Sequence, residues 1–186
     1  MLGWRMIAAI GLVLGALSGA VAAYETAGPR VDSGHGMHWQ EIAWPFPRDG
    51  WPPGRAFRCD AASCGSLVEL YVRPKIGFCN CDTGVADDDE VDRVADLDLM
   101  SDRFVPLEPG QVIRVDDMSG RARSYELTMS DGSRHAAVGI AVSHRCDLLV
   151  AVAKGEREAS GVQRIALDFL ASTDVKRWMM AAMDVR

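Results

Sequence analysis

Four residues whose side chains bind soft metals or exchange disulfides occur as two closely spaced pairs. Cys79 and Cys81 are separated by one residue, and so are His144 and Cys146. We expect the chain to be extended over 75–81, and side chains two residues apart in a strand lie on the same face of a sheet. If both pairs lie on neighbouring strands, three thiolates and an imidazole converge, which suits zinc or copper.

The competing interpretation of these cysteines is a disulfide, which removes thiolates from the ligand set. In an oxidising compartment Cys146 would bond to either Cys79 or Cys81. The C-x-C and H-x-C patterns are also weaker metal signals than paired C-x-x-C motifs. We therefore expect no cofactor, and zinc or copper at this cluster is the alternative. A third option, a strained Cys79–Cys81 bond, would make a reducible redox site.

The other two cysteines, Cys59 and Cys64, are close enough in sequence to form a local disulfide. Such a bond closes a small loop, so its contribution to the free energy of unfolding is modest. Two disulfides would use four of the five cysteines. The cysteine left over, Cys79 or Cys81, is then a free thiol or forms an intermolecular bridge.

Motifs of known enzymes are missing from the sequence: G-x-S-x-G, H-E-x-x-H and a phosphate-binding glycine loop do not occur. The acidic stretch 82–102 offers oxygens to calcium, but its spacing does not match an EF-hand loop. The solvated start of a helix explains these acidic residues better, because the helix dipole favours negative charge there. We therefore favour a binding function over an enzymatic one.

Three tryptophans, Trp39, Trp44 and Trp51, lie in a segment rich in glycine and proline, residues 24–58. That composition argues against a long helix or a central strand, and the aromatic residues argue against disorder. We predict an extended arm that lays its rings on the domain surface. The rings either cover the domain's own core or present a surface to a partner, because tryptophan is enriched at binding hot spots.

Residues 59–186 combine strand and turn signals with helical periodicity at the end. Strand patterns occur over 66–72, 104–107, 111–116, 123–129, 135–144 and 146–153. A short helix is predicted over 88–97 with Asp87 as its N-cap. Apolar residues at helical spacing over 162–170 and 175–183 predict two further helices. The fold class is α+β: an antiparallel sheet of about five to six strands, two C-terminal helices packed on one face, and the extended Pro/Trp-rich arm.

The N-terminal segment, residues 1–23, has the three parts of a secretory signal peptide: the basic Arg5, an apolar run, and small residues that end at Ala23. The apolar run is shorter than the roughly 20 residues that span a bilayer. Cleavage would lower the formal net charge from −6 to −7, because it removes Arg5 and no acidic residue. An acidic protein does not favour nucleic acid or anionic lipid.

These patterns together predict an exported protein, periplasmic or secreted. Its parts would be a signal peptide over 1–23, the arm over 24–58 and an α+β domain over 59–186. We expect a soluble binding or accessory protein of unknown ligand, with another periplasmic protein as the partner, no nucleic acid partner and no stable membrane span after cleavage. The alternative is a thiol-redox or metal-binding protein that uses the C-x-C and H-x-C cluster.

Overall fold

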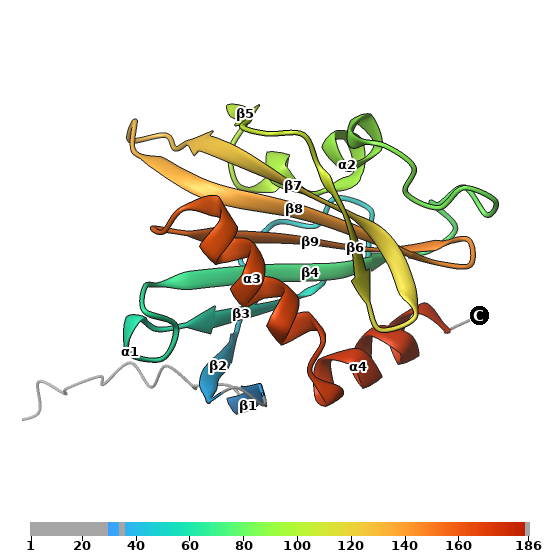
Figure 1. Cartoon of the computed structure of the whole chain (residues 1–186), viewed down its shortest axis with the longest axis horizontal. Coiled ribbons are helices and arrows are strands. Elements are labelled where there is room, and N and C mark those ends of the chain that lie inside the picture. The colour runs from blue at the N-terminus through green and yellow to red at the C-terminus, as the bar shows by residue number, and fades with distance from the viewer. Residues whose placement is uncertain (1–29, 34–35, 185–186) are drawn as a thin grey trace, which may run out of the picture.

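A computed structural model of the chain describes residues 30–33 and 36–184. These residues form a nine-stranded antiparallel sheet that carries helices on both faces (Figure 1). The α+β class and the antiparallel pairing predicted from the sequence are therefore confirmed. The signal peptide predicted over 1–23 lies outside the described residues.

The strands are longest in the centre of the sheet. In chain order they are β1 Arg30–Ser33, β2 Met37–Ile42, β3 Arg55–Cys59, β4 Val68–Lys75, β5 Phe104–Pro106, β6 Gln111–Val115, β7 Met118–Thr128, β8 Arg134–His144 and β9 Asp147–Gly155. The helices are α1 Ala61–Cys64, α2 Asp88–Val94, the 3-10 helix η1 Leu97–Leu99, α3 Ala159–Leu170 and α4 Thr173–Met183. The spatial order is β1-β2-β3-β4-β9-β8-β7-β5, and β6 also pairs with β7.

The predicted number of strands, five to six, is wrong because the arm 24–58 contributes strands of its own. β1 and β2 lie within it, and so does β3 except for its last residue, Cys59. Prolines and glycines gather in the loop 43–54, between β2 and β3. We predicted no strand in the arm because we considered its proline and glycine content as a whole. The stretches on either side of the loop have neither residue in their interior, so their backbone N–H groups are free to pair in a sheet.

The two C-terminal helices pack on one face of the sheet, as predicted (Figure 1). The buried side of α3 includes Val162 and Phe169, which lie over the alternate residues of the central strands that point to this face. Phe169 stacks on Trp39 of β2 with the ring centroids 4.4 Å apart. Among the described residues, none of the helices is both long and apolar enough to span a membrane.

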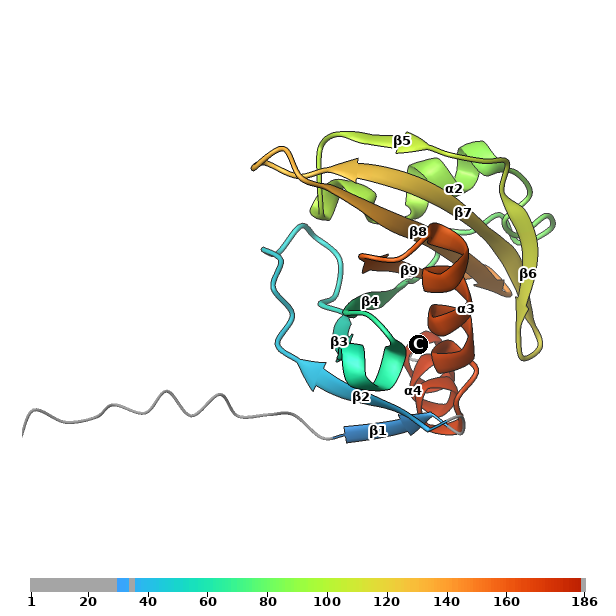
Figure 2. The same cartoon turned by 60° about the vertical axis from the view of Figure 1, so that its left-hand side comes forward.

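The opposite face is covered by α2 and by the loop 43–54 (Figure 2). Asp87 caps α2 as predicted, since its side chain accepts a hydrogen bond from the Glu90 N–H. The helix ends at Val94 rather than at 97, and a 3-10 turn follows it. The side chains of Val91 and Val94 are fully buried in the core of this face.

Charged groups of β4 are buried under the loop 43–54. Arg73 is 2% exposed, and its guanidinium donates to the carboxylates of both Asp49 and Asp96. Lys75 forms an ion pair with Asp96 at 2.7 Å. Because a buried charge is costly without a partner, these contacts fix the loop and the segment after α2 against the sheet.

The extension predicted over 75–81 is wrong, because β4 ends at Lys75 and a loop follows. Gly77 adopts a φ of +69°, in the left-handed region that glycine enters without a steric penalty. Its N–H donates to the carboxylate of Asp147, 2.6 Å away, at the start of β9. The chain therefore turns away from the sheet before it reaches the cysteines.

Candidate functional site

The structure contains two disulfides. One joins Cys59 at the end of β3 to Cys64 at the end of α1, as the short spacing suggested. The other joins Cys81 to Cys146, which is one of the two pairings considered for Cys146. Two such bonds fit a protein of an oxidising compartment, where disulfides persist.

The C-x-C and H-x-C residues do not form a set of metal ligands. Cys79 and Cys81 lie in a loop, His144 ends β8, and Cys146 lies in the turn before β9, so the strand argument for shared faces does not apply. Cys81 and Cys146 are bonded to each other and supply no thiolate. Over residues 36–184, no three or more His, Cys, Asp or Glu side chains are grouped to hold a metal ion.

Cys79 is the free cysteine, and it lies beside the second disulfide. Its N–H donates to the carbonyl of Cys146 at 3.1 Å. Burial raises the pKa of the Cys79 thiol, and the negative charges of Glu90 and Asp147 raise it further, although a hydrogen bond with Ser143 opposes them. The group is therefore a protonated thiol at neutral pH, which is a poor nucleophile.

The three tryptophans of the arm have different environments. Trp39 is fully buried, so the partner-surface interpretation does not apply to it. Trp44 packs edge-on against Tyr71, with the ring centroids 6.2 Å apart. Trp51 packs against Phe78 at 5.1 Å. Trp39 therefore covers the protein's own core, which is the first of the two options, whereas Trp44 and Trp51 are half-buried.

A groove that the sequence did not reveal lies between α3 and the connection from β5 to β6. Its volume is about 660 Å³. Its lining includes Ser124 of β7 and Ala136 of β8. Both have small side chains, and they point to the face of the sheet that α3 covers. They form a shallow floor, and the hollow above it stays open.

One wall of the groove is formed by two parallel rows of side chains on α3. Ala159, Gln163 and Leu167 follow one another at intervals of four residues, which places them on one side of the helix. A parallel stripe begins at Ser160 and ends at Asp168. The core-facing residues of α3 lie on the other side of the helix. The same helix therefore packs against the sheet and lines the groove.

The opposite wall is the edge of the sheet where β5 gives way to β6. Leu107, Glu108 and Gln111 line this side. The side-chain amide of Gln163 donates to Gln111 at 3.5 Å, a long hydrogen bond that links the two walls. Pairing with β7 continues through Pro106, and the Leu107 N–H still donates to the Ser124 carbonyl at 2.9 Å. Pro109 lies in the break that follows, and proline has no N–H for a sheet ladder.

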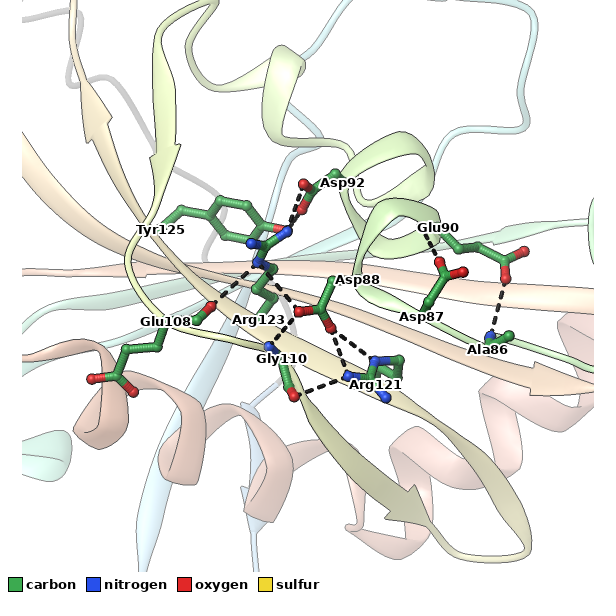
Figure 3. A network of polar contacts seen from close by, with 10 residues as sticks. All are labelled: Ala86, Asp87, Asp88, Glu90, Asp92, Glu108, Gly110, Arg121, Arg123 and Tyr125. Atoms are coloured by element: carbon green, nitrogen blue, oxygen red, sulfur yellow. Dashed lines mark hydrogen bonds and ion pairs between the residues drawn. The ribbon is translucent and has the colours of Figure 1, made fainter.

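A network of polar contacts holds this edge in place (Figure 3). The carboxylate of Asp88, the first residue of α2, accepts hydrogen bonds from the Gly110 N–H at 2.8 Å and from Arg121 at 2.6 Å. Arg121 also donates to the Gly110 carbonyl, and Arg123 donates to the Glu108 carbonyl. These bonds replace the missing strand pairing, so the wall has a defined position.

The network gives the Asp88 carboxylate a lowered pKa. The Gly110 N–H is the main cause and Arg121 is the next, because both stabilise the charged form. One helical turn later, Asp92 accepts hydrogen bonds from the Arg123 guanidinium, at 2.7 Å, and from the Tyr125 hydroxyl. Two carboxylates of α2 thus bind side chains of β7 on the face of the sheet opposite to the groove.

The groove carries an excess of negative charge. Glu108, Glu158 and Asp168 contribute carboxylates to its lining, and Arg164 contributes the guanidinium. Within the residues that the structure describes, none of these four side chains forms an ion pair. Their charges are therefore available to a ligand.

Apolar side chains are exposed along the same edge of the sheet. Val105 is 61% exposed, Leu107 52% and Val112 75%, and no other large apolar side chain in the described part of the chain exceeds them. Exposed apolar residues that gather at one place mark interaction surfaces. Val105 and Leu107 lie on the face of the sheet that carries the groove, whereas Val112 points to the opposite face.

Comparison of the sequence with protein-family models and with curated proteins finds no match. The sequence did contain partial signals of the groove. The polar stripe of α3 was visible in its spacing, and Pro109 marked the break between β5 and β6. The position of α3 opposite this break depends on contacts between distant parts of the chain. The spacing of residues along the sequence does not reveal such contacts.

Proposed function

We propose that the protein is an exported binding protein that takes its ligand in the groove between α3 and the β5–β6 edge. The observation that carries this proposal is the combination of an open hollow with unpaired charges in its lining. Its volume of about 660 Å³ falls within the range of small-molecule sites, about 300–1,000 Å³. Leu107, Ala136 and Leu167 supply apolar contact, and serines and glutamines supply hydrogen bonds.

The groove is held in shape before any ligand arrives, which supports the proposal. The inner wall is a twelve-residue helix anchored by its buried side. The outer wall is held by Asp88, Arg121 and Arg123. A site whose walls are already ordered loses less conformational entropy on binding, so more of the contact energy appears as affinity.

A neutral apolar dye, Nile red, tests whether the groove accepts a ligand. We expect its fluorescence to rise on binding to the wild-type protein. The substitution Ala136→Phe fills the floor, and Leu107→Asp makes the outer wall polar, so each should weaken dye binding about tenfold or more. Ala181→Phe places the same ring on an exposed position of α4, outside the groove, and serves as the matched control.

The two groove variants separate a local effect from misfolding. Leu107 is exposed, so its replacement by aspartate should leave the urea midpoint close to that of the wild type. Dye binding that is unchanged in both groove variants, or that falls equally in Ala181→Phe, would overturn the proposal.

Export is the second part of the proposal. It is supported by the signal-peptide pattern over 1–23 and by two disulfides, one of which involves the exposed Cys81. Expression of the chain in a Gram-negative host should give a product in the periplasmic fraction whose intact mass lacks about the first 23 residues. A full-length product retained in the cytoplasm would contradict this part.

A thiol–disulfide function is the second candidate, because the free Cys79 lies next to an exposed disulfide. The raised pKa of Cys79 argues against it. Alkylation of the native protein without reductant separates the two. Our proposal expects Cys79 to react slowly until the protein is denatured, and then as the one modified cysteine. Fast reaction in the native state, or three modified cysteines after denaturation, would favour the redox function.

A further inference from the structure

We infer that the natural occupant of the groove is a short extended segment of a partner polypeptide that carries basic and apolar side chains. This inference rests on the proposed function, since it names the ligand class of the same site. Four features of the groove lead to it: its length, its hydrogen-bonding groups, its charge and the apolar edge beside it.

The length of the groove fits an extended peptide. Its lining along α3 runs from Glu158, the N-cap residue, to Asp168, which corresponds to about 15 Å along the helix axis at 1.5 Å per residue. A peptide in strand conformation rises about 3.3 Å per residue. About four to five residues therefore span the groove, with the helix on one side and the sheet edge on the other.

The hydrogen-bonding groups of the groove match a peptide backbone better than a lipid-like chain. Ser124, Ser160, Gln111 and Gln163 can each donate and accept. An extended peptide presents an N–H and a C=O at every residue, so it can satisfy such groups on both walls. An alkyl chain would remove them from water without replacing their hydrogen bonds, which is costly.

The charge of the groove selects basic side chains. Glu108 lies on the outer wall, Glu158 precedes α3, and Asp168 lies near the far end of α3, so carboxylates are spread along the groove. Arg164 is the opposing charge in this lining. A lysine or arginine of the bound segment gains an ion pair with these carboxylates, whereas an acidic residue is repelled.

The apolar edge gives the bound segment a place for its other side chains. Side chains of an extended peptide alternate between two directions. When basic residues point to the carboxylates, their neighbours point the other way. The exposed apolar side chains of Val105 and Leu107 lie at the outer wall and can cover these neighbouring side chains of the peptide. Alternation of basic and apolar residues is therefore the sequence pattern that fits best.

Three labelled hexapeptides test this ligand class. They alternate leucine with lysine, with glutamate or with glutamine, and each has fluorescein at its N-terminus. Fluorescence anisotropy should show the tightest binding for the leucine–lysine peptide, followed by the glutamine and then the glutamate peptide. The preference for lysine should decrease between about 50 mM and 500 mM salt, because exposed ion pairs are screened.

Charge reversal tests the direction of the preference. The double variant Glu108→Lys with Asp168→Lys should bind the leucine–lysine peptide about tenfold more weakly and the leucine–glutamate peptide more tightly. The control variant Asp98→Lys with Asp102→Lys makes the same change of net charge at exposed positions outside the groove. It should leave the order of the three peptides unchanged.

The outcomes keep the ligand class separate from the groove function. If Nile red binding depends on Ala136 and Leu107 but the three peptides bind equally, the groove function stands and the ligand class is wrong. Tighter binding of dodecyltrimethylammonium, with the same dependence on the two carboxylates, would replace the peptide by a cationic amphiphile. Reversible self-association that is abolished by Ala136→Phe would make a second copy of this chain the occupant.

Discussion

At the residue scale, the clearest lesson concerns Trp39. It has the residue type of a binding hot spot, and it lies in a segment whose composition suggests a surface arm. Its ring is nevertheless fully buried and stacked on Phe169 of α3. The sequence indicated an aromatic side chain that must be buried. It did not indicate whether this protein or a partner buries it.

The burial of Trp39 leads to a stability prediction. Trp39→Ala removes a large ring from the core and should lower the free energy of unfolding by about 3–5 kcal/mol. Trp39→Phe should cost less than half of that, because it keeps most of the ring and removes an indole N–H that has no hydrogen-bond partner among the described residues. Urea unfolding of both variants checks the order. Equal losses for the two would contradict the stacked arrangement.

The carboxylate of Asp88 leads to a prediction about pH. Because its pKa is lowered in the folded protein, its stabilising effect is fully present above the ordinary aspartate pKa, about 4, and is lost as the pH falls through the lowered value. Asp88→Asn should therefore lower the urea midpoint at pH 7, and its difference from the wild type should disappear in acid. A difference that grows toward low pH would contradict the sign.

The control for Asp88 is its neighbour Asp89. Asp89 occupies the same first turn of α2 but is exposed, and within the described residues its side chain forms neither an ion pair nor a hydrogen bond. Asp89→Asn removes the same charge from the start of the helix. Only the Asp88 variant should also weaken Nile red binding, because only Asp88 holds the outer wall of the groove.

At the scale of elements, the helices and the later strands were predictable because each has a local signal. Apolar residues repeat at helical spacing in α3 and α4, and Asp87 marks the start of α2. The β5–β6 connection contains Pro109 and Gly110, and the β7–β8 turn contains Asp131 and Gly132, which are typical turn residues. The β8–β9 turn, Arg145–Cys146, carries no such signal. β2 and β3 were missed because the loop between them dominates the composition of the segment.

The two disulfides link elements over different distances along the chain, and this gives a third prediction. The Cys81–Cys146 bond closes a loop of 65 residues, and the Cys59–Cys64 bond closes one of 5. From loop entropy, loss of the long bond should cost about 4 kcal/mol and loss of the short one about 2 kcal/mol. Double serine variants of each pair, compared by urea unfolding, check this. The reverse order would contradict it.

At the scale of the whole molecule, the central feature is a sheet that is covered on both faces and faces α3 with its β5–β6 edge. Helices α3 and α4 cover one face, and α2 and the loop 43–54 cover the other (Figure 2). The β5–β6 edge is paired only with β7 and carries the exposed apolar side chains. The groove lies where this edge faces α3.

This arrangement was beyond prediction from the sequence for a physical reason. The groove depends on Asp88 reaching Gly110 and Arg121, contacts that join residues 22 and 33 positions apart. Local propensity and periodicity report neighbours along the chain, whereas such pairings follow from the sheet order. The strongest chemical signal in the sequence was the C-x-C and H-x-C cluster. In the structure, two of its cysteines form the Cys81–Cys146 disulfide and Cys79 is a free thiol.

The most direct test of the account is a titration of the ¹⁵N-labelled protein with the leucine–lysine hexapeptide, followed by amide chemical shifts. We predict that the largest shifts occur at groove residues, among them Leu107, Ser124, Ala136, Gln163 and Leu167. Amides of the loop 43–54 should stay unchanged, because that loop covers the opposite face. An absence of shifts at the groove, or shifts that gather over the loop, would contradict the central claim.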